Sequence, residues 1–237
     1  MTEETYRIKA IVLMRQPLRE HDLLVTVYSP EKGKQSLVAR GARKFRSKIA
    51  AHVEPFCFID CMVVCGKSHD YIGSALSSDC LPGLKSDLDK IEAASRVCRF
   101  FNLAIKEGQP EAQLFVELRD ILALIDGIGD PADVGLWADL SIFRLLSRTG
   151  YEPDLRNCVF CGSKPAAAGM VLDRRKNGIV CQRCASQAKG LTISENYVKL
   201  LRLANELEIS RFRNLKVSSE LALEISHIVT ILTEQHH

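Results

Sequence analysis

The chain has 237 residues, of which 46% are hydrophobic and 26% are charged, and its net charge is +3. These proportions are those of a folded globular protein and exclude disordered and fibrous classes. The apolar runs are all shorter than the ~20 residues that span a bilayer, and the acidic start of the sequence lacks the basic and apolar regions of a secretion signal. We therefore expect a cytoplasmic protein with no membrane partner.

The first eighty residues carry the pattern of short β-strands. Alternating or β-branched segments are separated by turn residues, as at Ser29-Pro30 and Gly33. The expected strands are residues 6–11, 23–28, 35–39, 56–65 and 71–76. Five strands at this spacing are typical of a small barrel, such as the five-stranded oligonucleotide-binding (OB) barrel.

A helical period begins after Leu81-Pro82-Gly83. Apolar residues recur every three or four positions within 88–105, 114–125 and 136–146, which predicts three helices. Ser194 and Ser219 are predicted to cap two further helices. The fold class expected is therefore α+β and multi-domain: an OB-type barrel over residues 1–80, then a helical domain over residues 81–237.

Two Cys-x-x-Cys pairs carry the strongest chemical signal. Cys158 and Cys161 are separated by nineteen residues from Cys181 and Cys184. This is the spacing of a four-thiolate zinc site, in which no coordination position is left for water or substrate. We expect one structural Zn²⁺ per chain, in a zinc-ribbon-like module at about residues 155–190 that is inserted in the helical domain.

The other five cysteines are predicted to be small buried side chains. Cys57, Cys61 and Cys65 share one parity along a strand, so they would face the same way, and the same interpretation covers Cys80 and Cys98. In a reducing cytoplasm we expect no disulfide framework.

A basic segment follows the third expected strand. It holds five cations and one aromatic residue and no acid within nine residues: Arg40, Arg43, Lys44, Phe45, Arg46 and Lys48. Such a loop can follow a phosphate backbone, and an aromatic ring can stack on a base. The alternative is a solvated loop that only aids solubility, but the barrel context favours nucleic-acid binding.

A second basic cluster lies between the two cysteine pairs. Arg174, Arg175 and Lys176 precede Asn177-Gly178, which suits a tight β-turn, so we expect a hairpin tip on the zinc module. Contact with DNA phosphates and a plain polar turn are equally good interpretations of this tip. Over residues 151–190, seven Lys and Arg face three Asp and Glu, so an anionic partner is favoured there.

Several catalytic motifs are absent from the sequence. It contains no P-loop, no Gly-x-Ser-x-Gly and no His-Glu-x-x-His, and its acids are scattered. A binding protein is therefore favoured over an enzyme; the alternatives are an RNA-binding or translation-associated adaptor and a metal-dependent nuclease or phosphotransferase. His236 and His237 are typical of an expression tag.

The ordered motifs resemble the bacterial recombination mediator family RecO. The resemblance is carried by residues 38–44, Glu54-Pro55-Phe56 and residues 145–153, followed by Cys158-Val159-Phe160-Cys161-Gly162 and Cys181-Gln182-Arg183-Cys184. It implies an OB barrel, a helical domain and, as in many members, a zinc module.

The resemblance also implies a non-enzymatic role in DNA repair, at the bacterial nucleoid. Family members bind single- and double-stranded DNA, anneal strands, associate with RecR and help load RecA on strands coated by single-stranded-DNA-binding protein (SSB). By resemblance, Arg40, Arg43, Lys44, Arg46 and Lys48 would be DNA contacts. Arg144 and Arg148 are weak candidates for contact with SSB, the alternative being ordinary surface ion pairs.

Overall fold

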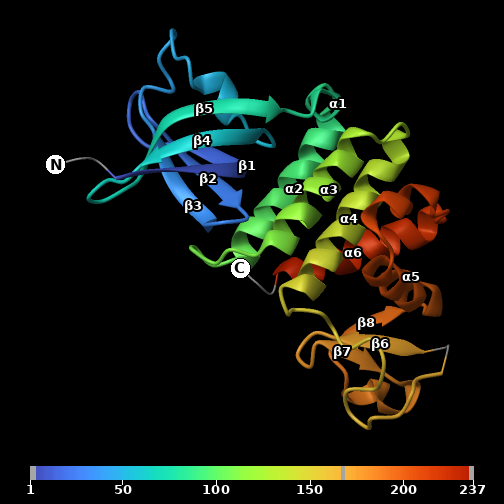
Figure 1. Cartoon of the computed structure of the whole chain (residues 1–237). Coiled ribbons are helices and arrows are strands. Elements are labelled where there is room, and N and C mark those ends of the chain that lie inside the picture. Colours follow the sequence, from blue (N-terminus) through green and yellow to red (C-terminus); the bar gives the residue numbers. More distant parts are fainter. Residues whose placement is uncertain (1–3, 167–168, 235–237) are drawn as a thin grey trace. The chain divides into compact units, whose positions relative to one another are not determined.

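The computed structural model describes residues 4–166 and 169–234 (Figure 1). His236 and His237, interpreted above as tag-like, lie outside the described residues. The chain divides into two compact units, Met1–Gly129 and Asp130–His237. Within the described ranges, every helix is too short or too polar to cross a membrane.

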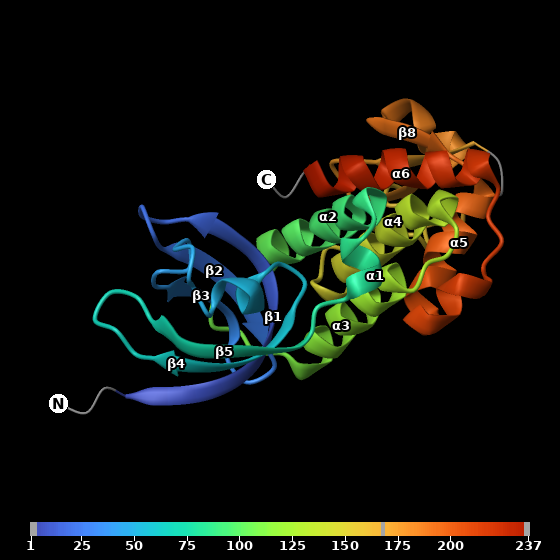
Figure 2. The same cartoon turned by 90° about the horizontal axis from the view of Figure 1, so that it is seen from above.

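The first unit is built on the predicted five-stranded barrel. Its strands are β1 (Thr5–Pro17), β2 (Leu23–Ser29), β3 (Gly33–Ala39), β4 (Phe58–Val64) and β5 (Tyr71–Asp79), closed in the order β1-β2-β3-β5-β4. The β3–β5 pair is parallel and the other pairs are antiparallel. The inward side chains are apolar, among them Val25, Leu37 and Val63, each fully buried. Both views show the β4–β5 turn at the barrel end away from α2 and α3 (Figure 1 and Figure 2).

Strand β1 is longer than predicted because it pairs with two neighbours in succession. Its first half pairs with β4 and its second half with β2, with an irregularity between Val12 and Met14. An extra residue at such a point bends the strand, so one strand can close the barrel from both sides.

Three α-helices complete the first unit: α1 (Pro82–Lys85), α2 (Leu88–Ala104) and α3 (Ala112–Asp126). The Asp87 carboxylate caps α2 by accepting from the backbone of Asp89 and Lys90. The ring of Tyr28, on β2, meets Phe101 edge to face at 4.9 Å, and its hydroxyl donates to the carbonyl of Glu111 at 3.3 Å. The compact unit thus extends to residue 129. The domain boundary expected at residue 80 stays a prediction.

The second unit contains α4 (Pro131–Arg148), α5 (Glu195–Glu206) and α6 (Ser219–Glu234), with α4 contacting both other helices. A three-stranded sheet is inserted between α4 and α5, in the order β7 (Gly178–Val180), β6 (Met170–Asp173), β8 (Gly190–Ile193). Ser194 caps α5, as predicted, by accepting from the Tyr197 backbone at 3.0 Å. For α6 the cap is Ser218 and not Ser219, because the Ser218 hydroxyl accepts from the Leu221 backbone.

Candidate functional site

The basic segment 40–48, here called the cationic loop, is fixed to the barrel at its base. Gly41 has a φ of +65°, and its N–H donates to the Asp22 carboxylate at 2.8 Å. Ala42 is buried in the barrel core, and the Arg43 backbone donates to the carbonyl of His21 at 2.9 Å. The loop is therefore anchored beside the β1–β2 turn, and in Figure 1 this light-blue part of the chain stands out from the barrel.

The predicted contact residues of the cationic loop are exposed. Arg43, Lys44, Arg46 and Lys48 point into solvent, and Phe45 is fully exposed. Within the described residues, none of these four cations forms an ion pair with a carboxylate. Their charge is thus free to meet an anionic ligand.

Arg40 is held differently from the other cations. Its guanidinium lies over the ring of Tyr71, 3.5 Å from the centroid, which is a cation–π contact. Tyr71 is the first residue of β5, so Arg40 links the start of the cationic loop to the parallel β3–β5 edge.

The structure brings one further cation to the cationic loop. Arg19, in the β1–β2 turn, is exposed, and its carbonyl accepts from the guanidinium of Arg43 at 3.2 Å. The same turn holds an exposed acid, Glu20, which lies 3.9 Å from the ring of His21. Sequence reasoning missed Arg19 because it lies 24 positions from Arg43 and in no charge run. A hairpin prediction joining the first two strands would have found it.

The four paired cysteines come together as predicted. The sulfurs of Cys158, Cys161, Cys181 and Cys184 all lie within 4.8 Å of one another. The Sγ atoms of Cys161 and Cys181 are 3.7 Å apart. Four thiolates at ~2.3 Å from a tetrahedral zinc ion would be about 3.8 Å from each other. The donor set and spacing therefore fit a closed zinc site with four cysteine ligands.

Each cysteine pair is shaped by a tight turn. At the first, the Gly162 N–H donates to the carbonyl of Cys158 at 2.8 Å, and Gly162 adopts a φ of +70°. At the second, the Cys184 N–H donates to the carbonyl of Cys181 at 2.9 Å, where the 3₁₀ helix η2 (Gln182–Gln187) begins. These turns direct both sulfurs of a pair to the same point.

The thiols of this cluster influence one another's ionisation. Hydrogen bonds from Ser163, whose hydroxyl is 3.1 Å from the sulfur of Cys161, lower the pKa of that thiol to about 6. The hydrogen bond to Cys161, followed by burial, raises the pKa of Cys184 to about 12. Without a cation, negative charge on one sulfur opposes ionisation of its neighbour, and a metal ion removes this conflict.

The basic hairpin tip also lies where it was expected. Arg174, Arg175 and Lys176 are exposed in the turn from β6 to β7. The buried Asp173 carboxylate holds this turn by accepting from the backbones of Arg175 and Lys176, and from Lys189 at 2.6 Å. Burial raises the pKa of Asp173, but these hydrogen bonds outweigh it and the net pKa is lowered.

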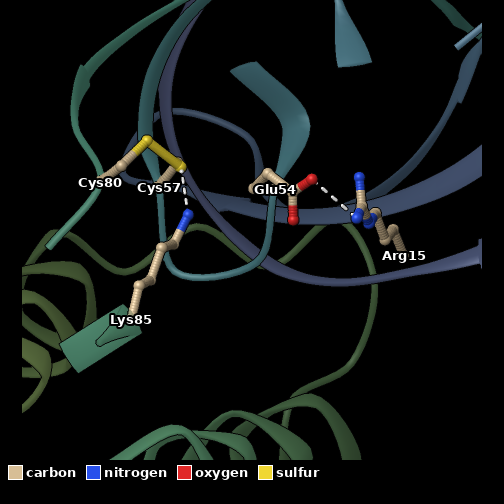
Figure 3. Close-up of polar contacts among 5 residues, drawn as sticks. All are labelled: Arg15, Glu54, Cys57, Cys80 and Lys85. Atoms are coloured by element: carbon tan, nitrogen blue, oxygen red, sulfur yellow. Dashed lines mark hydrogen bonds and ion pairs between the residues drawn. A yellow bond between two sulfur atoms is a disulfide. The ribbon is translucent and has the colours of Figure 1, made fainter. Parts of the chain in front are cut away.

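Two of the remaining cysteines overturn the expectation of reduced thiols. Cys57 and Cys80 form a disulfide, and the Lys85 ammonium lies 3.1 Å from the sulfur of Cys57 (Figure 3). The three strand cysteines also differ in burial: Cys57 and Cys61 are buried, and Cys65 is half-buried. Cys98 is buried as predicted, and burial raises its pKa, like that of Cys61, to about 12.

Arg144 is not a surface cation. It is buried, and its guanidinium donates to the carbonyls of Ala204 at 2.8 Å and Asn205 at 3.3 Å, and to that of Leu207. These carbonyls end α5, so Arg144 satisfies the last turn of that helix.

Comparison with known proteins covers nearly the whole chain. Residues 1–78 match the family model described as recombination protein O N terminal, and residues 85–237 match recombination protein O C terminal. The chain is 33% identical to the DNA repair protein RecO of Desulforamulus reducens, over 98% of this chain and 89% of that protein. It is 28% identical to the RecO of Clostridium novyi, with 98% and 89% covered, and 26% identical to that of Dehalococcoides mccartyi, with 93% and 86% covered.

Proposed function

The chain belongs to the RecO family of DNA repair proteins, and from that premise we propose that it is a non-enzymatic recombination mediator that binds and anneals DNA strands. The observation that carries the proposal is the cationic loop, whose base is hydrogen-bonded to the barrel and whose tip presents unpaired charge.

The cationic loop would act on the phosphate backbone. Arg43, Lys44, Arg46 and Lys48 each replace condensed counterions when they reach a phosphate, so binding gains from counterion release. Phe45 offers a ring for base stacking, which is sequence-tolerant because every base has a π-face. The base of the loop is already ordered, so less conformational entropy is lost on binding.

Annealing would follow from the same electrostatics. Two single strands repel each other through their phosphates, and a surface that carries several mobile cations reduces this repulsion where the strands meet. Arg19, in the adjoining β1–β2 turn, and Arg40, at the start of the loop, add positive charge beside it. Such a mechanism needs no bound nucleotide.

The zinc module would have a structural role. Its four thiolates fill a tetrahedral coordination shell, so the metal stabilises the fold of residues 158–184 and offers no position for a reacting water. The tip formed by Arg174, Arg175 and Lys176 would supply a second, weaker DNA contact.

For partners we propose RecR, SSB and, indirectly, RecA, at the nucleoid in the bacterial cytoplasm. The decisive experiment is annealing of complementary single strands, bare and SSB-coated, with and without RecR. The proposal predicts faster annealing with this protein on both substrates. If bare strands anneal at the uncatalysed rate when this protein is present, the mediator assignment is wrong.

A competition assay at fixed ionic strength tests the RNA-binding alternative. Labelled single-stranded DNA is displaced by unlabelled DNA or by structured RNA of equal length. We expect DNA to compete at least as well as RNA; stronger competition by structured RNA would favour an RNA-binding adaptor.

A further inference from the structure

The Cys57–Cys80 disulfide joins two connections of the barrel. Cys57 ends the segment that begins with the cationic loop and directly precedes β4. Cys80 follows β5 and precedes α1. The bond therefore ties the far end of the loop segment to the exit of the barrel (Figure 3).

Both cysteines adjoin backbone in a costly conformation. Phe56, before Cys57, has a φ of +70°, and Leu81, after Cys80, has a φ of +49°. Among the described non-glycine residues only Asn177 shares this feature. A bulky residue in the left-handed region is energetically unfavourable and persists only where its surroundings hold it. The disulfide is the covalent restraint common to both positions.

A cation is placed against one sulfur of the pair. The Lys85 ammonium donates to Cys57 Sγ at 3.1 Å. The acid near this group, Glu54, is engaged by Arg15 at 2.7 Å. Burial lowers the pKa of Lys85, Glu54 raises it and Arg15 lowers it again. The Lys85 ammonium is thus the hydrogen-bond donor placed where a Cys57 thiolate would form.

The two cysteines differ in exposure. Cys57 is 0% exposed, whereas Cys80 is half-buried and packs against the barrel core. Thiol–disulfide exchange begins when an external thiolate reaches one sulfur, and it is faster when the departing thiolate is stabilised. Attack at Cys80, the more exposed cysteine, would expel the Cys57 thiolate next to Lys85.

We propose that Cys57 and Cys80 form a reversible redox site whose substrates are small or protein dithiols, with Lys85 as the positioning residue for the Cys57 thiolate. A reductant thiolate attacks Cys80 Sγ, the S–S bond breaks and its electron pair leaves on Cys57 Sγ. The second thiolate of the reductant then attacks the reductant's sulfur atom in the mixed disulfide. Cys80 leaves as a thiolate and takes a proton from water. The dithiol leaves as a disulfide, having supplied two electrons.

Reduction releases a limited part of the chain. Helix α1 stays attached, because the Leu84 N–H donates to the Asp126 carboxylate at 2.6 Å. Phe56 and Leu81 lose their shared restraint. The segments that gain freedom are therefore residues 54–57 and 79–82, at the end of the cationic loop segment and the exit of β5.

The test uses the full-length zinc-loaded protein at pH 7. Reduction by dithiothreitol is followed by alkylation and peptide mass mapping, which separates Cys57 and Cys80 from the zinc ligands, and amide hydrogen exchange is measured before and after. We expect complete reduction, reoxidation by oxidised glutathione, and faster exchange confined to residues 54–57 and 79–82. Lys85→Met should slow reduction by about threefold or more, since the leaving thiolate loses its stabilising charge.

Lys90→Met is the matched control, because Lys90 is a half-buried lysine that does not contact sulfur; it should be reduced at the wild-type rate. Cys57→Ala/Cys80→Ala should show the exchange pattern of the reduced protein without any reductant. A disulfide that resists dithiothreitol, or one that never forms in oxidised glutathione, would overturn the redox site. Equal reduction rates for Lys85→Met and wild type would overturn the role of Lys85.

Discussion

Replacing Arg43, Lys44 and Arg46 together by Ala should weaken binding to single-stranded DNA and flatten its salt dependence. These side chains are exposed and without carboxylate partners among the described residues, so each is available to one phosphate. Three lost phosphate contacts on a single strand reduce the slope of log K against log salt by about 2. Extrapolated from 1 M to 0.15 M salt, that slope corresponds to roughly fiftyfold, or about 2 kcal/mol, as an upper limit.

The assay is fluorescence anisotropy with an unstructured labelled oligonucleotide at five salt concentrations. A matched control removes the same charge elsewhere: Lys199→Ala, Arg211→Ala and Lys216→Ala, of which the first two cations pair with Glu195 and Glu208. Phe45→Ala should lower affinity by about 1–3 kcal/mol with an unchanged salt slope, because stacking releases no counterions.

Equal salt slopes for the loop variant and the control variant would contradict a specific role of the cationic loop. Net charge alone would then explain binding, and the position of the cationic loop would be irrelevant. A loop variant with lower thermal stability than wild type would be compared at a temperature where both are folded.

Three further outcomes are expected. Chelation should remove about one zinc ion per chain and raise hydrogen exchange across residues 158–184 while residues 1–129 stay protected, because metal binding and folding are coupled. A metal-free chain with unchanged hydrogen exchange would contradict the zinc site. The lowered pKa of Asp173 stabilises the folded hairpin at pH values above the ordinary carboxyl pKa of ~3.9, and this stability is lost as pH falls through the folded pKa. Acidification should therefore lower the stability of Asp173→Asn less than that of wild type. Protonation of the zinc ligands affects both proteins equally and cancels in this comparison. Gly33→Ala should lower the free energy of unfolding by about 2–4 kcal/mol, because Gly33 has a φ of +69° and an added Cβ would lie 2.4 Å from the Gln109 backbone. The control is Gly129→Ala, where an added Cβ meets nothing within 4 Å, and its denaturation midpoint should be nearly unchanged.

The sequence was most informative where structure is decided locally. Alternation placed the five strands, and the Ser194 side chain marked the start of α5 because a cap needs only the three residues that follow it. The metal cluster was equally predictable, since two residues between cysteines force a turn that brings both sulfurs together.

Features that depend on distant contacts were missed or wrongly predicted. Cys57 and Cys80 lie 23 positions apart, and their pairing depends on where β4 begins and β5 ends. Arg144 looks like a surface cation in sequence, yet the carbonyls that bury it belong to α5, some sixty residues later. Ser218 and Ser219 are equivalent in composition, so only backbone geometry decides which one caps α6.

The contact between Tyr28 and the α2–α3 connection has a consequence for the order in which the chain is made. During translation β1 to β5 leave the ribosome before residues 101–111, so the strand that carries Tyr28 must wait for Phe101 and Glu111 to cover it. A nascent chain stopped near residue 80 would display an aromatic side chain that the finished protein hides completely. Such a truncated intermediate is a natural client for a chaperone at the exit tunnel.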